Sequence, residues 1–443
     1  MNALKDTSRA CPESGGVRSG LMWSAMLTGA TYVFPLIVYP HVSRVLGVAD
    51  IGLVGFIDSV VTWFILISMM GISILGIRET AKAGGSPEGL GRVLSGLLAV
   101  NGVMTLVCLV AMAAVTVAVP QLREHWRLMG VGMCKLLFNL FIVEWFWRGI
   151  GKFRYITVRT VVVRAAYVAA VFLTVKGPDD TFLYYFLTMT VVAVTAAVNM
   201  WRTRLYVAFP QGIVSLRRAA EDARRYARPF FSLGTYMLLT AFYTTLNVVI
   251  LGFVSTDTEV GYYSTAVKLF SIFLALITAL GMAVMPRTSV LASQGRRDVI
   301  RKESVRYVRV LICAAVPVSV LGVVFAPEAV MLLCGPGYEG AVLPVRIIFP
   351  FIVVFAIEQL LVMQILTPLG RDRAVNRNSL VAAAAGVVLN ALLVPRFGAA
   401  GSAVVWVTCE TIVMSLSIFS VRRALLAPEE SLSRARTRSR HAI

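Results

Sequence analysis

The chain has 443 residues, of which 58% are hydrophobic and only 15% are charged. Its mean hydropathy is +0.79, and apolar runs of about 20 residues, long enough to cross roughly 30 Å of hydrocarbon, recur throughout. This composition excludes a soluble globular protein. A net charge of +19 would suggest nucleic-acid binding in a soluble chain. Here the arginines collect in alternate loops between apolar runs, so no nucleic-acid partner is expected.

The sequence carries no pattern typical of metal or cofactor chemistry. Its six cysteines include no CxxC pair, and four of them lie inside apolar runs, where cysteine behaves as a small hydrophobic residue. No Walker or Rossmann motif is present, so neither ATP nor a dinucleotide is expected to bind. We therefore expect no cofactor, no metal and no catalytic residue.

The apolar runs predict an all-α polytopic membrane protein with about twelve transmembrane helices in two six-helix bundles. Residues 1–19 are expected to be a cytosolic N-terminal segment, residues 202–229 a basic cytosolic linker, and residues 422–443 a basic cytosolic tail. These flank the two bundles, 20–201 and 230–421. The spans are predicted at 20–43, 50–76, 93–118, 127–147, 155–175, 181–201, 230–253, 260–286, 305–326, 343–368, 376–394 and 399–421.

The distribution of positive charge supports this count and sets the orientation. With twelve spans, thirty-two of the 42 Lys and Arg residues fall in segments on one side and six on the other. Loops rich in Lys and Arg stay in the cytosol. Both termini and the central linker, including Gly212, are therefore predicted to be cytosolic, and removing one span would destroy the asymmetry.

A weak internal echo relates the two halves. Leu46-Gly47 followed by Gly52 in the first half resembles Leu251-Gly252 followed by Gly261 in the second. Two halves of the same orientation predict a parallel pseudo-repeat about an axis normal to the membrane, with a central cavity between them. Chance similarity between apolar helices is the alternative explanation.

Several charges fall inside the predicted spans. A charge at mid-bilayer costs about 2.5–3.5 kcal/mol on insertion scales, so these side chains must face a wet cavity or a partner. We interpret them as the lining of a cationic cavity that binds phosphate; the alternative is static pairing with buried carboxylates. The cavity candidates are Arg164, Lys268, Arg159 and Lys135.

Two further groups of charged residues are candidates for accessory roles. A basic cluster next to the fourth span could form the cytosolic mouth of the cavity, although positive-inside topology alone also explains it. Buried carboxylates could bind the coupling ion or simply pair with cations. The mouth residues are Arg148, Lys152 and Arg154, and the ion-coupling candidates are Asp58, Glu144, Glu358 and Glu410.

Motifs along nearly the whole chain resemble one membrane-protein family. These are Pro35-Leu36-Ile37-Val38-Tyr39-Pro40, Arg44-Val45-Leu46-Gly47, Gly76-Ile77-Arg78-Glu79, Glu144-Trp145-Phe146-Trp147-Arg148-Gly149, Val260-Gly261-Tyr262-Tyr263 and Pro395-Arg396-Phe397-Gly398. In this order they resemble the Wzx-type polysaccharide flippases of the multidrug/oligosaccharidyl-lipid/polysaccharide exporter superfamily. At Asn247 relatives often carry aspartate, so no proton-linked role is inferred there.

The resemblance implies a flippase in the bacterial cytoplasmic membrane. It would turn an undecaprenyl-diphosphate-linked oligosaccharide from the cytosolic to the outer leaflet by alternating access, coupled to an ion. A polysaccharide polymerase and a chain-length regulator are the protein partners implied. The related flippases of the peptidoglycan precursor usually have more than twelve spans.

Two other functions stay open. One is a drug or cation antiporter of the same superfamily, which the cationic interior disfavours because like charges repel strongly at low dielectric. The other is a membrane-embedded polysaccharide polymerase. Its longest predicted outer loop, 327–342, holds only Glu328 and Glu339 as charged residues, so an enzyme is not expected.

Overall fold

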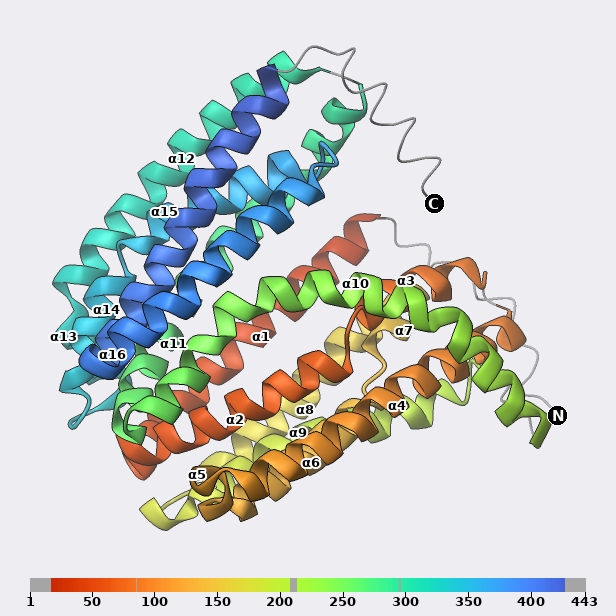
Figure 1. The fold of residues 1–443 in the computed structure, drawn as a ribbon, viewed down its shortest axis with the longest axis horizontal. Helices are drawn as coiled ribbons and strands as arrows, with labels where there is room; N and C mark the ends of the chain where they lie inside the picture. Colours follow the sequence, from red (N-terminus) through yellow and green to blue (C-terminus); the bar gives the residue numbers. More distant parts are fainter. Residues whose placement is uncertain (1–16, 85, 208–212, 295, 427–443) are drawn as a thin grey trace.

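The computed structural model describes residues 17–84, 86–207, 213–294 and 296–426. Within these residues all regular elements are helical, and they form two arms that lie close together at one end and diverge toward the other (Figure 1). The all-α class predicted from the sequence is confirmed. Most of the predicted tail and most of the predicted N-terminal segment lie outside the described residues, as does Gly212, whereas residues 422–426 of the predicted tail are helical.

Most of the first half of the chain forms the first arm. Its elements are α1 (Val17–Leu46), α2 (Val48–Ser68), α3 (Ile72–Lys82), α4 (Pro87–Ala118), α5 (Pro120–Glu124), α6 (Trp126–Asn139), α7 (Glu144–Gly149), α8 (Phe153–Thr174), the 3₁₀ turn η2 (Pro178–Asp180) and α9 (Thr181–Thr203). Ser86 caps α4 by accepting a hydrogen bond from the N–H of Gly89, and Pro87 occupies the first helical position, where its missing N–H costs nothing.

The second half continues with α10 and ends with the long α16. Its elements are α10 (Ile213–Val254), α11 (Asp257–Ser293), α12 (Arg297–Val324), α13 (Ala326–Cys334), the 3₁₀ turn η3 (Glu339–Ala341), α14 (Val342–Ile348), α15 (Phe351–Gln359), the π-helical segment η4 (Leu360–Leu366) and α16 (Asp372–Leu426).

The structure breaks several predicted spans into two helices. The span predicted at 50–76 is interrupted at Gly71, which has φ of 63°, a left-handed conformation that glycine adopts without steric cost. Residues 376–421 form one long element with a kink at Gly398, where φ is 51°. Two predicted spans therefore meet at a sharp bend and not at a loop.

Length and composition identify seven described helices as able to cross a membrane, or eight if the bent pair Glu339–Ile348 and Phe351–Leu366 is one span. Since α16 contains two predicted spans, these helices account for nine of the twelve. The other three, 20–43, 230–253 and 260–286, fall within α1, α10 and α11. A multi-span membrane protein is established, and the count of twelve stays a prediction.

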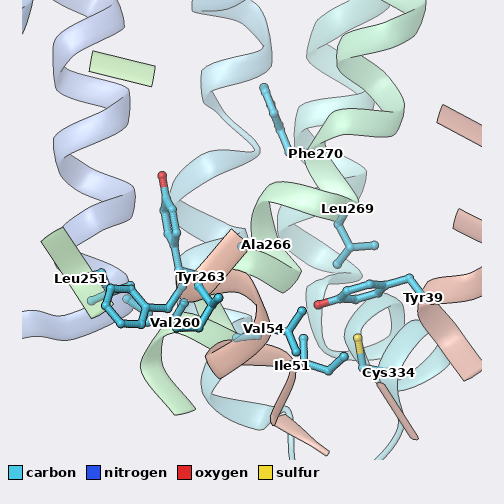
Figure 2. Close-up of a cluster of buried hydrophobic side chains, with 14 of the residues drawn as sticks. Tyr39, Ile51, Val54, Leu251, Val260, Tyr263, Ala266, Leu269, Phe270 and Cys334 are labelled. Carbon is cyan, nitrogen blue, oxygen red and sulfur yellow. The ribbon is translucent and has the colours of Figure 1, made fainter. Parts of the chain in front are cut away.

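The two arms join through a large apolar cluster where α1 and α2 meet α11 (Figure 2). Tyr39, Ile51 and Val54 from the first half pack with Val260 and Leu269 from the second half. Tyr39 Oη and Thr265 Oγ1 lie 2.9 Å apart and share a hydrogen bond. This cluster closes the end of the molecule opposite to the divergent arms.

Two glycines allow α2 and α11 to cross closely. A Cβ on Gly52 would lie 1.7 Å from the carbonyl oxygen of Asp257 and 2.8 Å from the N atom of Gly261. A Cβ on Gly261 would in turn lie 2.3 Å from the carbonyl oxygen of Val48. The contact is reciprocal and involves the two glycines that the internal echo placed at corresponding positions. Gly252, by contrast, packs inside α10 against the ring of Phe56, whereas Gly47 lies between two helices.

The segment predicted as a basic linker, 202–229, includes the beginning of α10. Tyr226 and Phe230 of α10 belong to an apolar cluster with Leu94 and Trp147 of the first half, and α10 also packs against α16. α10 thus contacts both halves. The division into bundles at 201 and 230 stays a prediction.

Candidate functional site

The first feature of the site is a half-buried arginine that binds the backbone of α1 next to a proline. Arg164 of α8 donates hydrogen bonds from Nη1 to the carbonyl oxygens of Ala30, at 3.3 Å, and Thr31, at 3.0 Å. In a regular helix the oxygen of Thr31 would accept from the N–H of residue 35, but that residue is Pro35, which has none. The proline therefore leaves an acceptor on α1, and the guanidinium satisfies it.

A lysine from the second half reaches the same turn of α1. Lys268 of α11 has an exposed side chain and lines a cavity of about 220 Å³ between α1, α11 and α13. The cavity is also lined by Thr31, Pro35, Leu36, Tyr39, Ser271, Ile272 and Leu333. Arg164 and Lys268, predicted to act together, thus approach one turn of α1 from opposite halves of the molecule.

Lys135 is held by a carboxylate of the same half. Its Nζ forms an ion pair with Oδ1 of Asp58 and lies 5.6 Å from the ring centroid of Tyr185. The hydroxyl of Tyr185 donates to the same Asp58 oxygen at 3.3 Å. The Lys135–Asp58 contact therefore agrees with the alternative in which a charge inside a span pairs with a carboxylate.

The paired residues are nevertheless close to the cavity. Lys268 interacts electrostatically with Asp58, Arg164 and Lys135. Arg164 also interacts with Glu144, but Arg148 and Arg159 already pair with that carboxylate. Positive charge therefore exceeds negative charge in this region. Tyr167 and Tyr184 interact electrostatically with the carboxylate of Asp58. The sequence offered no periodicity or motif by which to single out these tyrosines.

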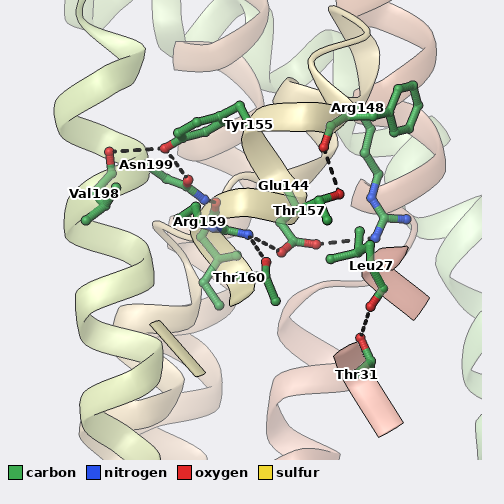
Figure 3. A network of polar contacts seen from close by, with 12 residues as sticks. Leu27, Thr31, Glu144, Arg148, Tyr155, Thr157, Arg159, Thr160, Val198 and Asn199 are labelled. Atoms are coloured by element: carbon green, nitrogen blue, oxygen red, sulfur yellow. Dashed lines mark hydrogen bonds and ion pairs between the residues drawn. The ribbon is translucent and has the colours of Figure 1, made fainter. Parts of the chain in front are cut away.

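Arg159 lies in a different network, around Glu144 (Figure 3). Its Nη2 donates to Oε1 of Glu144 at 2.7 Å and to Oγ1 of Thr160 at 3.0 Å. Arg148 donates to the other Glu144 oxygen at 3.3 Å. Val143, with a left-handed φ of 40°, turns the chain immediately before Glu144. This carboxylate therefore serves as the partner of two arginines.

The three predicted mouth residues do not form one group. Lys152 and Arg154 line a pocket of about 520 Å³ between α8 and α9 together with Arg159, whereas Arg148 is not among its lining residues. This pocket shares no lining residue with the cavity at Lys268. The sequence interpretation also missed Arg202 and Tyr206, which complete its wall.

The last two carboxylates lie inside the second half. Glu358 of α15 and Glu410 of α16 are 6% and 4% exposed and interact electrostatically with each other. Nε1 of Trp406 donates to Oε1 of Glu410 at 3.3 Å. In the described part of the chain no ion pair to either glutamate is formed, so they differ from Asp58 and Glu144.

Sequence comparison places the chain among known proteins. A family model described as "Polysaccharide biosynthesis protein" matches residues 17–292, which is more than half of the chain. The protein belongs to the polysaccharide biosynthesis protein family. A second model, MatE, matches residues 232–394. The resemblance drawn from the sequence motifs is thereby confirmed.

The chain is also similar to two curated proteins that are named as a transporter and a flippase. A protein of Escherichia coli strain K12 named "Putative O-antigen transporter" is 22% identical over 408 residues, covering 92% of this chain and 97% of the relative. The "Probable flippase AglR" of Haloferax volcanii is 26% identical over 185 residues, covering 41% of this chain and 39% of that protein.

Solved structures of an exporter and a flippase have folds similar to that of this chain. The lipid II flippase MurJ in an inward closed conformation superposes with a TM-score of 0.72 at 11% identity, covering 91% of this chain and 89% of that one. An inward-facing multidrug resistance transporter of the MATE family, in the MOP superfamily, gives 0.68 at 14% identity, covering 88% and 94%.

Proposed function

We propose that the protein is a flippase that moves an undecaprenyl-diphosphate-linked oligosaccharide from the cytosolic to the outer leaflet of the bacterial cytoplasmic membrane. One observation carries the proposal. Arg164 and Lys268, from opposite halves, approach the same turn of α1 beside a cavity. The family and the names of the curated relatives, a transporter and a flippase, support the same function.

The charge balance of the cavity region favours an anionic substrate. Lys268 interacts electrostatically with Arg164 and Lys135, and Asp58, which forms an ion pair with Lys135, supplies only one negative charge. Excess positive charge in a low-dielectric interior is costly unless an anion binds. A diphosphate provides that charge on oxygens that a guanidinium binds in a bidentate manner.

The same charge balance weighs against the alternative functions. A cationic drug would be repelled by the excess positive charge, although the MatE match keeps the antiporter as the nearest alternative. A polymerase would require a reactive constellation, and we propose that the protein is not an enzyme. A polysaccharide polymerase and a chain-length regulator act as partners in this proposal.

The arrangement of the arms supports alternating access. The arms diverge at the end where α1 begins and α16 ends (Figure 1). At the opposite end, Nη2 of Arg44 donates to the carbonyl oxygen of Leu332 at 2.7 Å. The hydroxyl of Tyr338 donates to the backbone carbonyl oxygen of Ser43 at 3.2 Å. In this proposal the divergent end faces the cytosol, as the loop charges indicate, and these contacts break when the outer side opens.

We propose that Glu358 and Glu410 bind the coupling proton. Two buried carboxylates without a cation are costly when both are ionised, so a proton on one of them stabilises their close approach. Binding and release of this proton would bias the packing of α15 against α16. Asp58 and Glu144 are poorer candidates because Lys135, Arg148 and Arg159 already neutralise them.

The proposal is tested by replacing the two cavity cations in a bacterial strain whose own repeat-unit flippase is deleted. Arg164→Ala and Lys268→Ala should abolish surface polysaccharide while membrane abundance stays near that of the parent. Arg164→Lys should restore transport in part, since a point charge replaces a bidentate fork. Lys176→Ala, an exposed lysine beyond α8, is the matched control and should have no effect. Normal surface polysaccharide in both alanine variants at ordinary abundance would refute the substrate role.

A further inference from the structure

The pocket between α8 and α9 is a second cationic site that the proposed translocation cavity does not use. Its volume is about 520 Å³. It lies around the first turns of α8 and the last turns of α9, next to the Glu144 network (Figure 3). The residues that line it are Lys152, Arg154, Tyr155, Val158, Arg159, Val162, Val163, Val198, Arg202 and Tyr206.

The charged part of the lining is entirely basic. The lining residues include Lys152, Arg154, Arg159 and Arg202 but no carboxylate. Arg202 lies 4.5 Å from the ring centroid of Tyr155, an arrangement that holds the guanidinium plane over the ring and leaves its edge free to donate. The four cations also surround the start of α8, where the helix dipole favours an anion.

One of these cations is buried with donors left over. Arg159 is 6% exposed, and its Nη2 is held by Glu144 and Thr160. Among the residues the structure describes, its Nε and Nη1 have no hydrogen-bond partner. A buried donor without a partner costs about 1–3 kcal/mol, more for a charged group. An anion in the pocket would satisfy these donors.

The rest of the wall is aliphatic and faces outward. Val158 and Val162 of α8 are 47% and 61% exposed, and Val198 of α9 continues the surface. Val162 is one helical turn deeper along α8 than Val158, so the aliphatic wall extends from the basic end toward mid-membrane. In a bilayer such a surface contacts acyl chains. The pocket therefore combines a headgroup-level cluster of cations with an apolar groove for a lipid tail.

We infer that this pocket binds the diphosphate of a lipid-linked substrate in the cytosolic leaflet before the lipid enters the central cavity. The inference rests on the proposed function and adds a loading site to it. Glu144 already neutralises Arg159, but Arg154 and Arg202 also line the pocket, and two such cations match the charge of a diphosphate better than that of a single phosphodiester. Arg154, which lies 5.9 Å from the ring of Trp23 on α1, joins the pocket to the helix that also borders the central cavity.

Binding of geranylgeranyl diphosphate to the purified full-length protein tests the inference, with Arg202→Gln and Arg154→Gln as pocket variants. The control is Arg204→Gln, an exposed arginine two residues beyond Arg202 that does not line the pocket. One lost charge-assisted hydrogen bond corresponds to about a tenfold loss of affinity. We expect that loss in both pocket variants and none in the control.

Competing lipids and one further variant separate this inference from its alternatives. Phosphatidylglycerol and inorganic pyrophosphate should each bind at least tenfold more weakly than the lipid diphosphate. Equal binding of phosphatidylglycerol would overturn the inference in favour of an ordinary phospholipid site, and unchanged affinity in both pocket variants would exclude the pocket altogether. In a Lys268→Ala background Arg202→Gln should still lower the affinity for the probe about tenfold, because Lys268 does not line this pocket. If the wild type binds the probe at the pocket but flips no lipid, the proposed function is wrong, whereas the pocket is still a binding site for a lipid diphosphate.

Discussion

Gly52→Ala should weaken the contact that holds the two halves together at the closed end. The added Cβ would lie 1.7 Å from the carbonyl oxygen of Asp257, whereas ordinary contacts are 3.4–4 Å. This oxygen belongs to backbone and cannot rotate away, so α2 and α11 must separate by on the order of 1.5 Å. Overpacking of this kind costs about 1–3 kcal/mol.

Thermal unfolding of the purified protein in detergent measures the effect. For a unit of roughly 200 residues, each kcal/mol lowers Tm by about 2–4 °C, so Gly52→Ala should lower Tm by about 2–12 °C. Gly261→Ala should act similarly, because its Cβ would lie 2.3 Å from the carbonyl oxygen of Val48.

Gly130→Ala is the control, since a Cβ there has no atom within 4 Å. Alanine in a helix interior stabilises relative to glycine by about 0.4–1 kcal/mol, so this variant should match or exceed the parent Tm. If Gly52→Ala were as stable as Gly130→Ala, the close crossing of α2 and α11 would not hold the halves together.

Three further predictions address charge and topology. Lys135→Met should destabilise the protein by about 1–3 kcal/mol, which is less than for a fully buried pair because the Asp58 side chain is 39% exposed. Adding Asp58→Asn should recover most of this loss of stability. A double variant as unstable as the single variant would refute the pairing. Glu410→Gln should leave abundance unchanged but remove the dependence of transport on the proton gradient, and a transport rate still responsive to that gradient would exclude this carboxylate. A reporter active only in the cytosol, fused after Arg204 at the end of α9, should be active, and activity of a periplasmic reporter there would overturn the orientation.

The sequence was sufficient to predict an all-α membrane protein with many spans, because burial in hydrocarbon requires long apolar runs whatever the tertiary fold. It also singled out Arg164 and Lys268, since charges inside such runs need a partner or a cavity. The internal echo placed Gly52 and Gly261 at corresponding positions, but it did not predict that they meet. These features depend on local composition and spacing, which the sequence records directly.

Other features depend on tertiary contacts that local sequence does not encode. The sequence shows Pro35 within an apolar run, but not that this proline frees the oxygen of Thr31 for Arg164. It grouped Arg159 with Lys268, although Arg159 pairs with Glu144 and faces another pocket. Arg202 looked like an ordinary positive-inside residue at the end of an apolar run. Only the packing of α9 beside α8 brings it into a site.

Translocation in proteoliposomes tests the central claim most directly. Purified protein is reconstituted with a fluorescent undecaprenyl-diphosphate-linked oligosaccharide, and a membrane-impermeant quencher reports how much of the lipid changes leaflet. The account predicts rapid exchange with the wild type, and exchange near the protein-free rate with Lys268→Ala. Exchange by Lys268→Ala at the wild-type rate, or no exchange by a folded wild-type protein, would contradict it.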